Sequence, residues 1–317
     1  MRHAEIGLIV KTWNTGEWLR RCLDAIIAAS PLPREIAVVD LGEDELSHVY
    51  ARDLAERHDV RLQWLPIGHR LAPGIANRRA LEALSTRLIG LLDDDIVVPR
   101  NWLGPLTSIL LDPGVGLVAP IRPDPFLAYP GRDESTEGVL DDLKKGLEGI
   151  PDLVKTYTHG RSLEDFGREV QRVNDLPREL AVEFPSFLSS CCLGISRGAI
   201  EAAGGIADPV FSAGYGSEDV DLTWRVLQAG YAAIRTSDVF VLHFRHTSLE
   251  ANHVDYATEL AAANRLLYAR WRKQLLTWGR DRLRRGDDRD DLTRRFIVRE
   301  LFRNTEFDGD LFRSSRR

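Results

Sequence analysis

From residue 5 to about 120, short apolar runs alternate with segments whose apolar residues recur every three or four positions. The runs, rich in β-branched residues, predict buried strands, and the segments between them predict amphipathic helices. The expected strands are EIGLIV, EIAVVDL, RLQWLPI, RLIGLLDDD and VGLVAPI, and the expected helices are GEWLRRCLDAIIAAS, DELSHVYARDLAERH, GIANRRALEALS and NWLGPLTSILLD. This alternation predicts an α/β fold with a mainly parallel sheet flanked by helices.

The alternation of strand and helix patterns stops between residues 121 and 185, where prolines and mixed charges replace the regular spacing of apolar residues. We interpret this segment as an insertion of loops with one or two helices. Apolar order returns at Phe187 and reaches the strand-like SDVFVLHFRHTS. We therefore expect three parts: an α/β half over 1–120, a second half over 121–256 that contains the insertion, and a helical, Arg-rich extension over 257–317.

Composition and charge limit the class of protein. At 317 residues, the chain suits one large α/β domain with a smaller appendage. Its 44% hydrophobic and 28% charged residues are typical of a soluble globular protein. A net charge of −6 and a pI near 5.8 give no general attraction to nucleic acid, so we expect no nucleic-acid partner.

The cysteines and the apolar runs indicate a compartment. Cys22, Cys191 and Cys192 are odd in number and two are adjacent, so we expect no disulfides and a reducing, cytoplasmic location. The apolar run before Lys11 is too short for a signal peptide, and no stretch approaches the roughly 18 apolar residues of a membrane span. We expect any membrane contact to be peripheral.

Three adjacent carboxylates, Asp93, Asp94 and Asp95, directly follow the apolar IGLL. In an extended segment, Asp93 and Asp95 face the same side, roughly 6.5 to 7 Å apart along the strand. Two such carboxylates suit a hard cation, Mg²⁺ or Mn²⁺, that also binds substrate phosphates. The simpler alternative is a polar strand end in which Asp95 makes a local turn bond.

Other polar residues also follow expected strands. Thr12 and Asn14 come after the first strand, and Asp40 ends the second. Ligands of such sheets bind beyond the carboxyl ends of the strands, so we expect these side chains near the aspartate cluster.

The segment GSEDVDLTWRVLQAG predicts a helix. Ser217 is a suitable N-cap, and Gly230 suits the C-terminal stop. The apolar stripe is Val220, Trp224 and Leu227. Glu218 and Asp219 fall in the first turn, where acids stabilise the helix dipole without any catalytic role. Asp221 and Arg225, at i and i+4, predict an exposed ion pair.

Taken together, four segments resemble the family-2-type, nucleotide-sugar glycosyltransferases with the GT-A fold. They are IGLIVKTWNTGEWLRRCLDAI, EIAVVDLGEDE, ANRRALEALSTRLIGLLDDDIVVPRNWL and GYGSEDVDLTWRVLQAGY. The resemblance covers residues 5–120 and 187–248. It implies a Rossmann-like sheet, with a nucleotide-sugar-binding half over 1–120 and an acceptor side over 121–256.

The resemblance also implies roles for individual residues. Asp40 would pair with the donor's nucleobase, Asp93 and Asp95 would hold the metal on the diphosphate, and Asp95 would be its direct ligand. Asp219 would be the general base, with Glu218 beside it assisting the acceptor. His243, which ends the strand VFVLH, would lie near metal and phosphate, although His246 competes for that place. The full donor-binding set that we predict is Thr12, Asn14, Asp40, Arg78, Asp93 and Asp94.

Elementary chemistry agrees with these roles. A carboxylate at Asp40 accepts from uracil, thymine or guanine, whereas cytosine N3 is itself an acceptor, so UDP, dTDP or GDP donors are expected. A divalent cation stabilises the charge that develops on a diphosphate leaving group. Attack from the opposite face needs a carboxylate apart from the metal pair, and Asp219 is the best-placed candidate.

Some positions depart from the family pattern. Lys11 stands where proline is usual, and Leu41 where a small polar residue commonly follows the aspartate. The family's Arg-Asn pair appears here in swapped order, as Asn77-Arg78. A solvated Lys11 and a surface Arg78 are the simpler interpretations, and contact between Arg78 and a phosphate is the functional one.

Three alternatives remain beside an inverting glycosyltransferase. A retaining enzyme would use the same metal site without Asp219 as base, and a nucleotide-sugar-binding protein would lack turnover. A nucleotidyltransferase would normally carry a Gly-rich phosphate loop, which VKTWNTGEW lacks. The C-terminal helices suit contact with anionic lipid or a second copy, and the stripe that includes Trp271 and Trp278 favours packing. The acceptor cannot be named.

Overall fold

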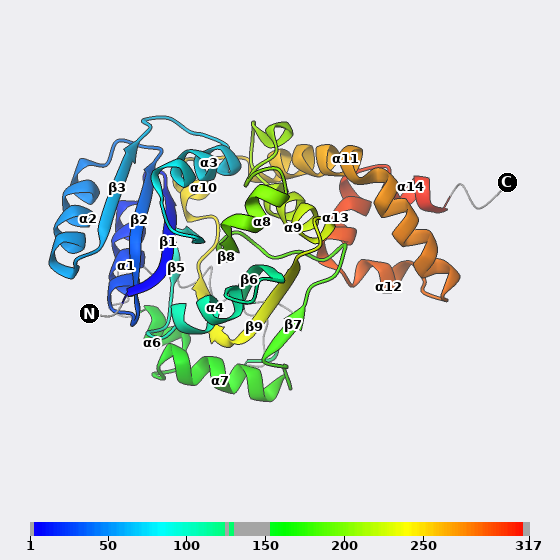
Figure 1. The fold of residues 1–317 in the computed structure, drawn as a ribbon. Coiled ribbons are helices and arrows are strands. Elements are labelled where there is room, and N and C mark those ends of the chain that lie inside the picture. Colours follow the sequence, from blue (N-terminus) through cyan, green and yellow to red (C-terminus); the bar gives the residue numbers. More distant parts are fainter. Residues whose placement is uncertain (1–2, 124–126, 130–152, 313–317) are drawn as a thin grey trace.

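The computed structural model describes residues 3–123, 127–129 and 153–312 (Figure 1). An eight-stranded sheet has the order β3-β2-β1-β4-β8-β6-β9-β7, and β10 and β5 form a separate two-stranded ladder. The strands are β1 (His3–Thr12), β2 (Leu32–Asp40), β3 (Arg61–Pro66), β4 (Leu88–Asp93), β5 (Ile96–Val97), β6 (Val115–Ile121), β7 (Glu179–Ala181), β8 (Cys192–Ser196), β9 (Ala232–Phe240) and β10 (Leu242–His243).

Parallel pairing dominates the sheet, as the sequence predicts. β3, β2, β1 and β4 run parallel, and so do β6 and β9. β8 runs antiparallel to both β4 and β6. The predicted strand SDVFVLHFRHTS was misplaced: β9 begins earlier, at Ala232, and His243 belongs to the separate strand β10.

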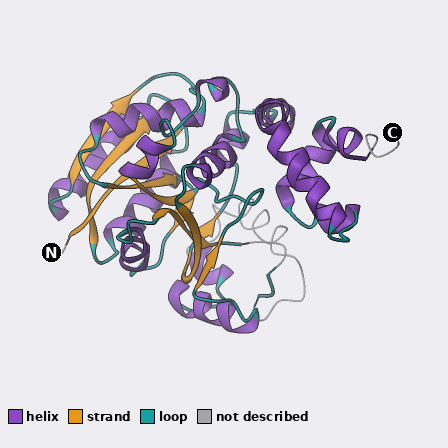
Figure 2. Cartoon of the chain, turned by 45° about the vertical axis from the view of Figure 1, so that its right-hand side comes forward, coloured by secondary structure: helices purple, strands orange, loops and turns teal. Residues whose placement is uncertain are grey.

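Helices cover both faces of the sheet. They are α1 (Gly16–Ile27), α2 (Glu45–His58), α3 (Pro73–Ala83), α4 (Leu103–Leu110), α6 (Leu153–Tyr157), α7 (Leu163–Val173), α8 (Arg197–Ala202), η1 (Pro209–Phe211), α9 (Glu218–Gln228), α10 (Thr247–Ala251), α11 (Tyr256–Arg284), α12 (Arg289–Thr293), α13 (Phe296–Asn304) and α14 (Phe307–Phe312). In Figure 2, the sheet and the helices that cover it lie on one side of the molecule, and the helical C-terminal region lies on the other.

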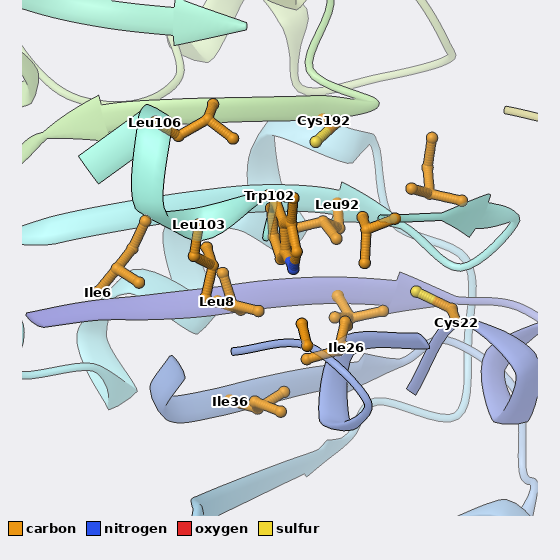
Figure 3. Packing of buried hydrophobic residues seen from close by; sticks show 14 of the residues in the cluster. Ile6, Leu8, Cys22, Ile26, Ile36, Leu92, Trp102, Leu103, Leu106 and Cys192 are labelled. Atoms are coloured by element: carbon orange, nitrogen blue, oxygen red, sulfur yellow. The ribbon is translucent and has the colours of Figure 1, made fainter. Parts of the chain in front are cut away.

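Alternation along β1 explains the two core layers. Leu8 and Val10 pack with α1 and α4, as Figure 3 shows for Leu8, Ile26 and Leu103. Ile9, on the opposite face, packs with the layer that contains α3, α8 and α9. Because neighbouring strand residues face opposite sides, a strand buried on both faces is a continuous apolar run.

The insertion predicted over 121–185 contains helices α6 and α7 in its described part, and its residues 124–126 and 130–152 lie outside the described residues. Phe166 of α7 packs edge-on against Phe240 of β9, with ring centroids 5.4 Å apart. Its short strand β7 extends the sheet beyond β9. Two helices therefore agree with the sequence interpretation, whereas the added edge strand was not predicted.

The C-terminal helices pack against α9. Val220 and Trp224 of α9 share an apolar cluster with Leu267, Trp271 and other residues of α11 and α13. This packing confirms the predicted stripes of both helices. Among the described residues, no helix is both long and apolar enough to cross a membrane.

The Asp221–Arg225 ion pair is buried, and its predicted exposure was wrong. Arg225 Nε donates to Asp221 Oδ2 at 2.7 Å, and the side chains are 8% and 0% exposed. Asp221 Oδ1 accepts from Trp271 Nε1 and lies 2.8 Å from Arg270 Nε. The i, i+4 pattern is the same on buried and exposed helices, so only the packing of α11 reveals the burial.

We expect Trp271→Phe to lower the free energy of unfolding by about 1.5 to 3 kcal/mol, because it removes a hydrogen bond to a buried carboxylate. Urea denaturation of the parent and the variant measures the difference. Trp278→Phe, at a half-buried position of the same helix, is the matched control. Equal losses in the two variants would show that the bond to Asp221 contributes nothing specific.

Candidate active site

The carboxyl ends of β1 and β4, neighbours in the sheet, open into a cavity of about 240 Å³. The start of α9, the segment that joins β10 to α10, the residues before β8, and parts of α11 and α13 also line it. Residues from distant parts of the chain therefore meet at the sheet edge where ligands of such folds bind.

The three aspartates lie at the end of β4. Asp93 is the last residue of the strand, and Asp94 and Asp95 form the turn that leads to β5. β5 pairs antiparallel with β10, with Ile96 opposite His243. This short ladder brings the histidine beside the aspartates.

Asp93, Asp95 and His243 form one cluster whose ligand atoms all lie within 4.8 Å of one another. His243 Nε2 is 3.2 Å from Asp95 Oδ1 and 3.8 Å from Asp93 Oδ2. Thr247 Oγ1 donates to Asp95 Oδ2 at 3.0 Å. Asp95 Oδ1 is buried and makes no hydrogen bond to any residue that the structure describes.

The charges of Asp95 and His243 support each other. Burial raises the pKa of Asp95, but His243 and the Thr247 donors outweigh it and hold that pKa at about 2. Burial lowers the pKa of His243, whereas Cys191 and Asp95 raise it to about 10. The metal-free cluster is thus a carboxylate beside an imidazolium, and a divalent cation at His243 would replace the ring proton.

The donor set fits a divalent cation. Carboxylate oxygens suit Mn²⁺ and Mg²⁺, and Asp95 Oδ1 is a buried acceptor that a cation would satisfy. Of the two histidines that the sequence left open, His243 lies with the acids. His246 stacks on Tyr256, with ring centroids 4.4 Å apart.

Asp94 lies outside this cluster. Its Oδ2 accepts from the hydroxyl of Thr15, just before α1. Burial and the charge of Asp95 raise the pKa of Asp94 to about 7. The carboxyl group of Asp94 therefore joins the turn to the start of α1, while Asp93 and Asp95 turn toward His243.

Glu218 and Asp219 line the same cavity from the first turn of α9. Asp219 Oδ2 accepts from the backbone N–H of Ser190 at 3.3 Å, and its Oδ1 accepts from that of Val220 at 2.8 Å. Burial raises the pKa of Asp219. Burial and the charge of Asp219 raise the pKa of Glu218 to about 8. At neutral pH, Glu218 therefore holds a proton, and two backbone amides fix the carboxyl group of Asp219 beside it.

We expect Glu218→Gln to stabilise the metal-free protein increasingly as the pH rises from about 5 to 8. The pKa of Glu218 is about 8 in the folded state against an ordinary 4.5, so in this window the unfolded chain releases a proton that the folded protein keeps. A rising pH therefore favours unfolding of the parent but not of the variant. Melting temperatures across the range in EDTA measure the effect. Glu201→Gln, at an exposed position of α8, should show a constant difference.

Ser217 occupies the N-cap position of α9 but does not cap the helix, contrary to the prediction. Its φ of 66° lies in the left-handed region, and its side chain makes no capping hydrogen bond. The hydroxyl instead donates to Asn264 Oδ1 of α11 at 2.9 Å. This bond ties the start of α9, and with it Asp219, to the C-terminal helices.

The predicted donor-binding residues fall into two groups. Thr12 lines the cavity with Asp93 and Asp94. Asn14, Asp40 and Arg78 are not among the described residues that line it: Asn14 Nδ2 donates to Asn252 Oδ1 at 2.6 Å, and Arg78 is exposed on α3. Asp40 is buried, and its carboxylate accepts from the amides of its own loop, Gly42 at 3.0 Å and Asp44 at 3.3 Å.

Several contributors to the site were missed. Thr247 lies near the end of the predicted strand-like segment SDVFVLHFRHTS, and its hydroxyl was a readable signal. The Ser190 amide leaves no sequence signal, because every non-proline residue carries one. A second cavity of about 640 Å³ adjoins the first through Arg122, Phe187 and Arg245. Its wall combines apolar side chains with arginines.

A family model matches the part of the chain that carries the aspartate cluster. The family model of glycosyl transferase family 2 matches residues 8–154, which include the end of β1, Asp40 and the three aspartates. This match agrees with the resemblance read from the motifs: residues 8–154 are similar to the glycosyltransferases of this family.

The relatives agree with this class. The chain is 26% identical over 249 residues to a pre-mycofactocin glycosyltransferase of Mycobacterium tuberculosis, covering 78% of this chain and 44% of that protein. The chain thus spans less than half the length of this curated relative.

Solved structures confirm the GT-A fold. A mannosyltransferase from Pyrobaculum calidifontis in complex with GDP-Man and Mn²⁺ matches with a TM-score of 0.53 at 19% identity, covering 97% of this chain and 72% of that one. S. aureus TarS residues 1–349 match with a TM-score of 0.52 at 12% identity, covering 99% and 73%. GalNAc-T7 with UDP, GalNAc and Mn²⁺ matches with a TM-score of 0.51 at 16% identity, covering 75% and 43%.

Proposed function

We propose that this protein is a metal-dependent glycosyltransferase that moves a sugar from a nucleoside-diphosphate sugar to an acceptor hydroxyl, with inversion. The observation that carries the proposal is that the Asp93–Asp95–His243 cluster and the Glu218–Asp219 pair line one cavity. The first set suits a cation on a diphosphate, and the second suits proton transfer from an acceptor.

Asp95, Asp93 and His243 would hold Mn²⁺ or Mg²⁺. When bound, the cation supplies charge stabilisation to the leaving diphosphate. Asp95 is the principal ligand in this proposal because its Oδ1 is buried and lies 3.2 Å from Nε2 of His243, the third member of the cluster. The Mn²⁺ complexes of two structural neighbours support the assignment of the metal class.

Asp219 would accept the proton of the acceptor hydroxyl. The amides of Ser190 and Val220 fix its orientation, and burial raises its pKa toward the range in which a carboxylate works as a base. Glu218, whose pKa is about 8, would carry a proton and donate a hydrogen bond to the acceptor. The second cavity, with its apolar and arginine-lined wall, is the proposed approach of the acceptor.

A thermal-shift screen tests the proposal. Nucleoside diphosphates and their sugars are added with and without Mn²⁺, because a ligand that binds only the folded state raises the melting temperature. We expect a shift with UDP, dTDP or GDP that needs Mn²⁺, and none with CDP. A purely binding protein would give the same shift without hydrolysing or transferring the sugar. A retaining enzyme would give a product of unchanged anomeric configuration.

We expect Asp40→Asn to weaken binding of the nucleoside diphosphate by about 1.5 to 3 kcal/mol, because a hydrogen bond from the base to a buried carboxylate loses its charge. Calorimetric titration in Mn²⁺ measures the loss. Inorganic pyrophosphate, which has no base, should bind the parent and the variant equally. An equal loss of affinity for pyrophosphate would mean that Asp40 acts only by holding its own loop, whose amides its carboxylate accepts from.

A further inference from the structure

Lys11 carries a positive charge into the cavity, contrary to the interpretation of a solvated side chain. It is the penultimate residue of β1, and the parallel ladder places it beside Asp93. Its Nζ lies 3.1 Å from Asp93 Oδ1, and its side chain is 10% exposed. The sheet register therefore fixes a cation next to one of the proposed metal ligands.

The ammonium group of Lys11 retains unused hydrogen-bonding capacity. It has three protons to donate, yet Nζ is buried and makes no hydrogen bond of good geometry to a described residue. The contact with Asp93 is an ion pair alone. Its long, flexible stem allows the charge to move by a few ångströms without a change in the backbone.

Carboxylates outnumber Lys11 around it. The acids among the described lining residues are Asp93, Asp94, Asp95, Glu218, Asp219 and Glu300, and Lys11 lines the cavity together with Arg70, Arg122 and Arg245. The charge of Lys11 also reaches Glu218. A diphosphate that enters this cavity meets carboxylates on two sides, so a cation that the protein itself supplies has an electrostatic task there.

We propose that Lys11 is a phosphate-binding residue of the donor site. In the free protein, its ammonium group pairs with Asp93. When a metal ion binds Asp93, the ammonium group moves to the diphosphate. This inference rests on the proposed function, because it assigns a contact within the same donor site. Lys11 and the metal ion compete for Asp93 while the site is empty, and they cooperate on the diphosphate once the donor is bound.

The test is Lys11→Met, which keeps the length of the side chain and removes its charge. Two binding constants should move in opposite directions. Affinity for Mn²⁺ alone should rise about tenfold, because Asp93 is released from its ion pair. Affinity for the nucleoside diphosphate in saturating Mn²⁺ should fall about tenfold, because a charged phosphate contact is lost. Electron paramagnetic resonance of free Mn²⁺ gives the first value, and calorimetry gives the second.

Control variants separate this role from a structural one. Lys273→Met, at an exposed position of α11, should change neither constant. Lys11→Arg keeps the charge and should keep most of the affinity for the nucleotide. Should Lys11→Met fail to fold by circular dichroism, Lys11→Gln provides the same two measurements with a polar, uncharged side chain.

If neither binding constant changes in Lys11→Met, or if both change in the same direction, the inference is overturned and the proposed function remains intact. A parent protein that binds no nucleoside diphosphate in Mn²⁺ would overturn the proposed function and the phosphate role together. The two failures are therefore distinguished by the parent alone.

Discussion

Asp95→Ala is expected to abolish the Mn²⁺-dependent stabilisation by nucleoside diphosphates. Without a cation, the two charges of a diphosphate would face the carboxylates of Asp93 and Asp95 at close range. The variant also removes the buried oxygen that lies 3.2 Å from His243 Nε2. A melting-temperature screen with Mn²⁺ and nucleoside diphosphate, alone and together, measures the loss.

The control for Asp95 is Asp112→Ala, which changes an exposed aspartate after α4 and should leave the shift intact. Because Asp95 also accepts from Thr247, the variant must first be shown to fold by its circular dichroism spectrum. A folded Asp95→Ala protein that still binds the nucleotide in Mn²⁺ as tightly as the parent would prove the metal assignment wrong.

Asp219→Asn is expected to lower turnover by about 10²- to 10⁴-fold, which is what general-base catalysis typically supplies. The asparagine keeps the shape of the side chain, and its carbonyl oxygen can still accept from one of the two amides that hold Asp219. Binding of donor and metal should therefore persist. Single-turnover kinetics with the sugar nucleotide and an active acceptor separate the chemical step from binding.

The anomeric configuration of the product completes this test. NMR of the parent's product should show inversion, because a base on the face opposite the nucleotide implies direct displacement. Retention of configuration, or an Asp219→Asn variant that keeps most of its turnover, would favour the retaining alternative. Asp238→Asn, outside the cavity in the strand β9, is the matched control.

Much of the fold could be predicted because its strands and helices carry distinct periods. The apolar runs that became β1, β2 and β4 are buried on both faces, and the amphipathic stripe of α9 packs as its spacing indicates. The strands β5, β7 and β10 could not be predicted, because two or three residues carry no period. Their pairing depends on tertiary contacts.

The same limit applies to the site. The motif spacing identified Asp93, Asp95 and Asp219 as candidates, and the structure brings them to one cavity. The choice of His243 over His246 required the β5–β10 ladder, which the sequence did not reveal. Ser217 does not cap α9, because its backbone has a left-handed conformation. The presence of a serine in the sequence does not indicate that conformation.

The buried carboxylate of Asp221 links the α/β part of the chain to the helix α11. Two of its three partners, Arg270 and Trp271, belong to α11. A chain shortened to end at residue 256 would keep all the proposed metal ligands and the base in its sequence. It would nevertheless remove these partners from α9 and expose Val220 and Trp224 to water. A minimal fragment should therefore keep α11, since the sequence motifs alone would suggest a piece that lacks two of the partners of Asp221.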